Sequence, residues 1–160
     1  MSSLVMPSGL IARDGELSLV LTGLHPPDEA RGWVPYYAFV IAVGGVPAGT
    51  IRLRIGDEPD LVLYGGHVGY DVLPAFRGRH YAERACRLLF PLMRANGQHI
   101  VWITCNPDNQ ASRRTCERLG AEFVEIIDFP SDSDMYLRGE RRKCRYRLVV
   151  PAEAALSRLI

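Results

Sequence analysis

The residues with the clearest chemical signature lie where a strand ends and a helix begins, at Val72–Ala82. Pro74 ends the strand, a short loop with Gly78 follows, and a helix is expected from Arg79 onward. The first backbone N–H groups of a helix lack an intrahelical acceptor and together carry about half a positive charge. Arg77 and Arg79 add two formal charges. This combination predicts a site for phosphate, and especially for a diphosphate.

The same stretch resembles the acetyl-CoA signature of the GNAT acyltransferases, Q/R-x-x-G-x-G/A. Arg77 matches its first position and Ala82 matches its last. His80 stands where the signature has Gly, which lets the backbone approach the pyrophosphate closely, although a histidine within a helix still offers its N–H. The resemblance implies that the CoA pyrophosphate is bound by six consecutive residues, which are Arg77, Gly78, Arg79, His80, Tyr81 and Ala82.

A second segment is similar to another part of the same family. The run from Asn106 to Gly120 resembles the family's N-x-x-S…E-K-L-G segment, with Asn109 and Ser112 at the first two fixed positions. The resemblance implies that Asn109 and Ser112 line the CoA arm. It places Cys116 where many members have a tyrosine that protonates the leaving thiolate. The branch with the ribosomal-protein N-terminal acetyltransferases is the most similar, and the resemblance covers about residues 36–150.

The resemblance also implies where the reaction would occur. Pantetheine would lie in an opening between the fourth and fifth expected strands, bonded to the main chain at Val72 and Leu73. A backbone N–H there would bind the acyl oxygen, and the acceptor amine would attack the thioester directly. His67 is our candidate base, because it precedes this point on the strand and histidine ordinarily titrates at about pH 6.5. A purely structural histidine is the alternative.

The proton donor for the leaving thiolate has several candidates. Tyr70 lies close to the expected acyl site, as a possible acid or as a packed wall of the site. Cys116, Ser112 or water could serve instead. A nucleophilic role for Cys116 is disfavoured, because no histidine or other base accompanies it in the sequence.

Hydrophobic periodicity predicts the elements that position these residues. Strands are expected at Leu17–Leu21, Tyr36–Val43, Ala48–Ile55, Leu61–Leu73 (with a bulge at Gly65-Gly66), Ile100–Cys105, Ala121–Phe129 and Cys144–Val150. Helices are expected at Arg79–Asn96 (kinked or ended at Pro91), Asn109–Leu119 and Ala152–Ile160. Residues 1–15, Thr22–Pro35 and Ser131–Glu140 read as a lead-in, a turn-rich segment and a polar loop. The predicted fold is α/β, a mixed sheet in which β-hairpins are followed by βαβα and a C-terminal β-hairpin.

Composition indicates one domain over residues 1–160, since 48% hydrophobic residues suffice for a core. The net charge of +1 and the strand-like alternation in Arg138–Arg147 argue against nucleic acid as a partner. No signal peptide and no apolar run of about 20 residues is visible, so we expect a cytoplasmic protein without a membrane partner. Four cysteines without a CxxC or Cys/His pattern predict buried reduced thiols and no metal; they are Cys86, Cys105, Cys116 and Cys144.

Together these features predict an N-acetyltransferase that uses acetyl-CoA and a primary amine acceptor. The short Thr22–Pro35 segment predicts an open acceptor side, which suits a protein N-terminus or another bulky amine and still admits a small molecule. The departures at His80 and Cys116 leave a second hypothesis, a CoA-binding sensor or scaffold with little turnover. A plain domain that binds no CoA is the third. Ala152–Ile160 either closes a homodimer or packs on the sheet.

Overall fold

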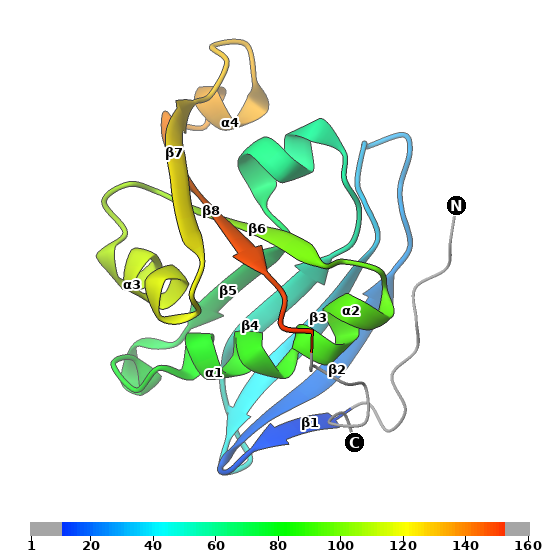
Figure 1. Ribbon diagram of the computed structural model, residues 1–160, viewed down its shortest axis with the longest axis vertical. Helices are drawn as coiled ribbons and strands as arrows, with labels where there is room; N and C mark the ends of the chain where they lie inside the picture. Colours follow the sequence, from blue (N-terminus) through cyan, green and yellow to red (C-terminus); the bar gives the residue numbers. More distant parts are fainter. Residues whose placement is uncertain (1–10, 153–160) are drawn as a thin grey trace.

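Two antiparallel sheets form the framework of the computed structural model, which describes residues 11–152 (Figure 1). The first sheet has the order β1-β2-β3-β4-β5, and the second has the order β6-β8-β7. The strands are β1 (Ile11–Asp14), β2 (Leu17–His25), β3 (Tyr36–Val43), β4 (Val46–Arg54), β5 (Val68–Val72), β6 (Ile100–Cys105), β7 (Glu122–Asp128) and β8 (Arg142–Val149). The helices are η1 (Leu61–Gly65), η2 (Pro74–Phe76), α1 (Tyr81–Leu88), α2 (Phe90–Ala95), α3 (Gln110–Arg118) and α4 (Asp134–Leu137). The mixed α/β architecture expected from the sequence is confirmed.

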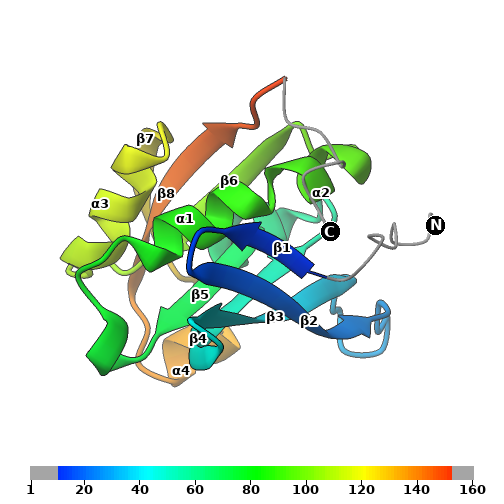
Figure 2. The same ribbon diagram turned by 90° about the horizontal axis from the view of Figure 1, so that it is seen from below.

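Helices α1 and α2 cover one face of the first sheet and close the main core (Figure 2). The fully buried side chains come from alternate strand positions and from one stripe of the helices, and include Leu17, Leu19, Tyr37, Ile41, Ile51, Leu53, Ala85, Leu89, Leu92 and Met93. The helix breaks between Leu88 and Phe90, just before Pro91. Pro91 lacks the N–H donor that would continue the helical hydrogen bonds of α1, so the expected interruption at Pro91 is confirmed. Within residues 11–152, no helix is long and apolar enough to cross a lipid bilayer.

The N-terminal segment contains a strand where a loose lead-in was expected. β1 pairs with β2 through a tight turn in which Gly15 has φ 59°. Gly15 at the first of the two central positions was the signal for this hairpin, because a two-residue turn with positive φ only at that position favours glycine there. Arg84 of α1 forms ion pairs with Asp14 and with Glu16. The hairpin is therefore held against the helix whose first residues form the site.

The expected strand Leu61–Leu73 is wrong in its first half. Leu61–Gly65 forms the single π-helical turn η1, and β5 begins only at Val68. The pairing with β4 explains the difference, because the register ends where Leu53 faces Val68. Only Arg54 of β4 remains beyond this pair, and its N–H donates to the His67 carbonyl at 2.7 Å. Residues 61–65 therefore have no β4 residue to pair with, and the backbone bonds turn inward, as in the bond from Gly66 N–H to the Leu61 carbonyl.

The C-terminal half differs in two further places. The expected polar loop at Ser131–Glu140 contains α4, whose first turn is capped by the Ser133 side chain. Arg145, expected on a solvated face of the last strand, is only 5% exposed. It stacks over the Trp102 ring at 4.1 Å and donates to the Val62 carbonyl of η1, because η1 covers that face of β8. The helix expected at Ala152–Ile160 lies outside the described residues.

A buried histidine joins the two sheets. The His67 N–H donates to the Trp102 carbonyl at 2.7 Å, and the Trp102 N–H donates to His67 Nδ1 at 2.8 Å. His67 Nε2 bonds the Gly56 carbonyl at 2.8 Å, so the ring is a neutral imidazole with its proton on Nε2. β5 and β6 are not paired beyond this point and diverge toward the start of α3 (Figure 1). We call these bonds the His67–Trp102 clamp.

Helix α1 starts from a residue in a left-handed conformation. His80 has φ 63° and ψ 25°, and it is the only non-glycine residue with positive φ among residues 11–152. The prediction of a helical His80 is therefore wrong, because the residue caps the helix instead. Left-handed backbone is uncommon for side chains with a Cβ and easy for glycine. This is the physical reason why the signature has Gly at this position.

We expect the clamp to make stability depend on pH. Burial lowers the pKa of His67; Arg54 also lowers it, and the Gly56 carbonyl, Glu58 and Asp57 act in the opposite direction. The unfolded chain therefore takes up a proton at about pH 6.5 that the folded chain resists, so the free energy of unfolding falls as the pH drops below that value. The slope from this group is at most about 1.4 kcal/mol per pH unit.

Urea unfolding at pH 7.5 and 5.5 should show a smaller pH effect in His67→Gln than in the wild type. The exposed His99→Gln is the control and should keep the wild-type pH effect; an unchanged effect in His67→Gln would contradict the prediction.

We also expect His80→Gly to stabilise the protein by roughly 0.5–1 kcal/mol, because glycine relieves the left-handed strain and loses only part of that gain to its greater freedom when unfolded. Arg79→Gly is the matched control, since Arg79 is an exposed neighbour without positive φ. It should destabilise the protein by a similar amount. Equal losses of unfolding free energy in both variants would show that the left-handed conformation carries no strain.

Candidate functional site

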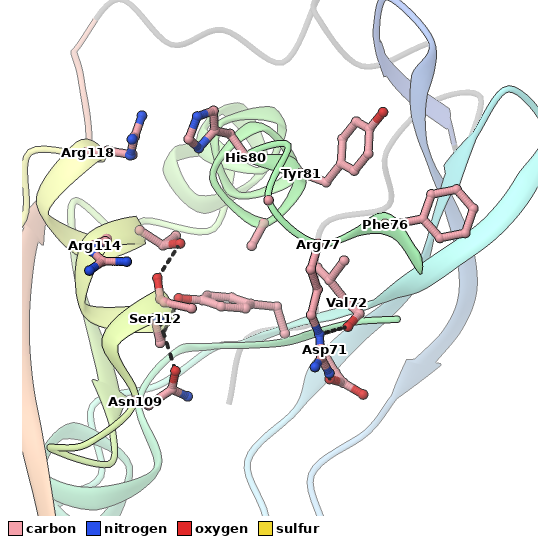
Figure 3. A pocket seen from close by; sticks show the side chains of 15 residues that line it. Asp71, Val72, Phe76, Arg77, His80, Tyr81, Asn109, Ser112, Arg114 and Arg118 are labelled. Carbon is pink, nitrogen blue, oxygen red and sulfur yellow. Dashed lines mark hydrogen bonds and ion pairs between the residues drawn. The ribbon is translucent and has the colours of Figure 1, made fainter. Parts of the chain in front are cut away.

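A cavity of about 480 Å³ lies where β5 ends and where α1 and α3 begin (Figure 3). It sits at the divergence of the two sheets beyond the His67–Trp102 clamp. The lining residues are Tyr70, Asp71, Val72, Phe76, Arg77, Gly78, His80, Tyr81, Ala82, Asn109, Ala111, Ser112, Arg114, Thr115 and Arg118. Three segments that are distant in the sequence thus form a single cavity.

One end of the cavity is built to bind an anion. Within residues 11–152, the N–H groups that start α1, from His80 to Glu83, have no side-chain cap and no backbone acceptor. A Cβ added to Gly78 would meet no atom within 4 Å, so the loop leaves open space in front of these donors. Arg77 lies on one side of the cavity and Arg114 and Arg118 lie on the other (Figure 3). Helix dipole and guanidinium groups together favour a group with several negative charges.

Arg77 also has a structural role. Its Nε donates to the Val72 carbonyl at 2.8 Å, and its Nη2 lies 3.9 Å from Asp71 Oδ1. The side chain therefore ties the glycine loop back to the end of β5. Loss of Arg77 would remove both a positive charge and this tie.

The main chain of β5 offers donors to the cavity at alternate residues. The Leu73 N–H donates to the Ala48 carbonyl at 2.8 Å, so it faces β4 and not the cavity. Successive backbone groups of a strand point to opposite sides, so the N–H of Val72 points away from β4. Of the two residues expected to bond the ligand's arm, Val72 lines the cavity and Leu73 does not.

A hydroxyl pair forms the floor of the cavity. Tyr70 Oη and Ser112 Oγ lie 2.7 Å apart and join β5 to α3. The Asn109 side chain accepts from the Ser112 N–H at 3.1 Å, so Asn109 caps α3 and fixes the position of Ser112. Burial raises the pKa of Tyr70 far above its ordinary value, so the phenol stays protonated and able to donate.

The expected buried, free cysteines are confirmed, and three of them, Cys86, Cys105 and Cys116, lie near Tyr70. Cys116 is fully buried and does not line the cavity. Burial raises its pKa, and contact with Tyr70 lowers it by a smaller amount. The pKa of Cys86 rises to about 12 for the same reason of burial. A thiol that stays protonated and hidden cannot attack a ligand, so this geometry gives Cys116 a packing role.

His67, our candidate base, lies outside the cavity lining. The side chain is 2% exposed, and both ring nitrogens are engaged by the main chain at Gly56 and Trp102. A general base needs a free nitrogen within hydrogen-bond reach of its substrate. The structure therefore assigns His67 to the clamp and does not support its role as a base.

Most of the other expected site residues meet at the cavity. Arg79 is exposed and, like Leu73, lies outside the lining, whereas Arg77, Gly78, His80, Tyr81, Ala82, Asn109 and Ser112 all line it. The lining residues that sequence reasoning did not select are Asp71, Phe76, Ala111, Arg114, Thr115 and Arg118. Arg114 and Arg118 lie one helical turn apart on the same face of α3, and that spacing was the available signal. The adjacent Arg113 turns away and donates to the Tyr146 hydroxyl at 3.1 Å.

Solved structures with the same fold include several named acetyltransferases. RimL, a ribosomal-protein alpha-N-acetyltransferase in its apo form, has a TM-score of 0.57 and 20% identity over 78% of this chain and 75% of its own. RimJ of Mycobacterium smegmatis, in complex with CoA-disulfide, has a TM-score of 0.57 and 18% identity over 81% of this chain and 60% of its own. The microcin self-immunity acetyltransferase MccE, in complex with acetyl-CoA and AMP, has a TM-score of 0.57 and 21% identity over 72% of this chain and 61% of its own.

At sequence identities of 18–21%, the similarity to these solved structures establishes the shared fold alone. No curated protein sequence matches the chain significantly. Residues 18–121, well over half of the chain, match the family model described as the acetyltransferase (GNAT) family. That range includes both the Arg77–Ala82 helix start and the Asn109–Ser112 turn that line the cavity. The chain therefore belongs to the acetyltransferase (GNAT) family.

Proposed function

We propose that this protein is an N-acetyltransferase that transfers the acetyl group of acetyl-CoA to a primary amine. One observation carries the proposal, namely a single cavity that joins an anion-binding helix start to a buried pair of hydroxyl donors. CoA has matching parts, because its pyrophosphate is strongly anionic and its thioester is neutral. RimJ and MccE, which have the same fold, hold CoA-disulfide and acetyl-CoA in their structures.

The residues of the cavity suit each part of acetyl-CoA. The N–H groups at the start of α1, with Arg77, Arg114 and Arg118, would bind the pyrophosphate. The pantetheine would extend along β5, where the N–H of Val72 points away from β4 and can bond an extended chain. Ser112 and Asn109 line the opposite side. The thioester would then lie near Tyr70.

The reaction proposed for this cavity is direct transfer. The amine nitrogen attacks the thioester carbonyl carbon, the C–N bond forms, and the C–S bond breaks with its electron pair on sulfur. Tyr70 donates a hydrogen bond to the developing thiolate, supported by Ser112 at 2.7 Å. Tyr70 reaches α3 beside Cys116, so it would supply from β5 the hydroxyl that many family members carry on the helix. Because His67 is engaged in the clamp, the amine loses its proton to solvent.

The acceptor side is proposed to be open. The segment between β2 and β3 contains no helix, and a second cavity of about 600 Å³ lies between this segment and η1. This opening suits a protein N-terminus or a small amine. RimL, which shares the fold, is a ribosomal-protein alpha-N-acetyltransferase, and this makes a protein N-terminus one acceptor to test.

The first test is binding of CoA and release of thiol. Calorimetry should show CoA binding to the wild type, and Arg114→Glu should weaken it at least about tenfold, because it replaces a cation with an anion beside the pyrophosphate. Arg138→Glu, an exposed arginine after α4 and outside the cavity lining, is the matched control and should bind CoA normally.

Thiol release from acetyl-CoA with a panel of amines and peptides completes this test. Turnover above the rate without protein supports the enzyme. Binding of CoA without thiol release would instead support a sensor or scaffold, and the absence of any CoA binding would refute both hypotheses.

Tyr70→Phe should lower kcat by about 10- to 100-fold and change the Kd of CoA less than about twofold, because the hydroxyl acts on the leaving sulfur and not on the pyrophosphate. Steady-state kinetics and calorimetry measure the two quantities. Tyr136→Phe, which removes a hydroxyl from α4, is the control and should keep the wild-type kcat. A wild-type kcat in Tyr70→Phe would remove Tyr70 from the mechanism.

A further inference from the structure

The second cavity carries charges that the transfer of an acetyl group does not by itself require. It lies on the face of the first sheet that α1 and α2 leave uncovered, between the 26–35 segment and η1 (Figure 1). The lining consists of Gly32, Trp33, Val34, Tyr36, Arg52, Arg54, Glu58, Pro59, Asp60, Leu61 and Gly65. Two arginines from one strand, Arg52 and Arg54, therefore face the same space.

Neither arginine has an acidic partner. Within residues 11–152, Arg52 and Arg54 take part in no salt bridge, although Glu58 and Asp60 line the same cavity. Arg54 is half-buried, and within residues 11–152 the one hydrogen bond of its side chain goes to the Gly66 carbonyl at 3.3 Å. Desolvation and the neighbouring Arg52 lower the pKa of Arg54. Two neighbouring guanidinium groups that form no salt bridge favour the binding of an anion between them.

The arginine pair lies directly behind the proposed acyl site. A Cβ added to Gly69 would lie 3.3 Å from Arg54 Nη1, so the guanidinium covers β5 at Gly69. Tyr70, the next residue, points to the opposite face of the strand and lines the CoA cavity. An acceptor whose anion binds Arg54 would have its amine close to the diverging strands. Because Arg54 lies so close to β5, only a few bonds can separate the anionic group of such an acceptor from its amine.

Aromatic side chains shape the rest of this cavity. Trp33 is 54% exposed, and Tyr36 lies beneath the Arg52 guanidinium at 5.5 Å. Rigid aromatic walls bind a backbone or an alkyl chain with little loss of conformational entropy. Glu58 and Asp60 give the same cavity an acidic part that suits the ammonium form of the acceptor. The cavity thus offers positive, negative and aromatic surfaces.

We propose that Arg52 and Arg54 bind a carboxylate of the acceptor, so that this protein selects primary amines that carry a carboxylate within a few bonds of the amine. The inference rests on the proposed acetyl transfer and adds the substrate class. Arginine forks bind carboxylates through two parallel hydrogen bonds, which an uncharged amide cannot replace. The carboxylate can come from an acidic side chain next to a peptide N-terminus or from a small amino acid.

The test uses matched acceptors that differ only in the carboxylate. Ala-Glu-Ala amide is compared with Ala-Gln-Ala amide, and β-alanine is compared with β-alaninamide, which separates the two sources. Calorimetry on the CoA-saturated protein gives each Kd without turnover, and thiol release from acetyl-CoA gives kcat/KM. At least one acid is expected to bind, and to react, at least about tenfold better than its amide. Arg54→Gln should abolish that preference, and Arg54→Lys should keep part of it.

The controls separate this inference from the proposed function. Arg13→Gln removes an exposed arginine of β1, at the opposite edge of the sheet, and should keep the preference. Arg54→Gln should leave the Kd of CoA unchanged and should not lower the melting temperature, because it removes a poorly compensated charge. If thiol is never released, the function fails, but a carboxylate preference in binding still supports this inference. If CoA does not bind, the same acceptor titrations on the ligand-free protein decide whether the carboxylate preference exists. Equal Kd values for acids and amides, no binding of either acid, or a preference that survives Arg54→Gln would overturn it.

Discussion

The arrangement of this protein depends on one buried junction, the His67–Trp102 clamp. Two hydrogen bonds connect the sheets at this point, and a third fixes the imidazole to the Gly56 carbonyl. Because β5 and β6 form no ladder beyond the clamp, they are free to diverge, and the divergence opens the space for a ligand. Buried hydrogen bonds of this kind are costly to lose in a low-dielectric interior. His67, whose chemistry would favour a role as a base, thus has a structural role at the point from which the two strands diverge.

The cavity beyond the clamp has a clear division of charge. Its outer end combines a helix start, Arg77, Arg114 and Arg118, whereas its floor consists of Tyr70 and Ser112 backed by buried neutral thiols. A ligand with an anionic end and a neutral reactive end matches this division. The interruption before β5 matters equally, because η1 replaces a strand there and Arg145 fixes η1 to the second sheet. Leu61 and Gly65 of η1 also line the second cavity.

Two cavities therefore approach the same short strand from opposite faces. Tyr70 of β5 lines the first cavity, whereas Gly69 lies on the face of Arg54, which lines the second cavity. Glycine at position 69 gives Arg54 room to lie against the strand, since a Cβ there would be 3.3 Å from Arg54 Nη1. The alternation of a β-strand thus places the two cavities on opposite faces of the sheet.

The sequence by itself determined the family, the mixed α/β fold and the helix start at Arg77–Ala82, because these depend on local patterns such as the glycine loop after β5 and the Asn109 cap. It also predicted the helix break at Pro91, which follows from proline's missing donor. Only the tertiary structure decided the roles of His67, Cys116 and Arg145, because burial and partners from distant segments determine what a titratable side chain can do. The same holds for η1, where the end of β4 removed the partner that an apolar strand needs. Residues 61–65 are apolar enough for either structure, and pairing with a distant segment made the choice.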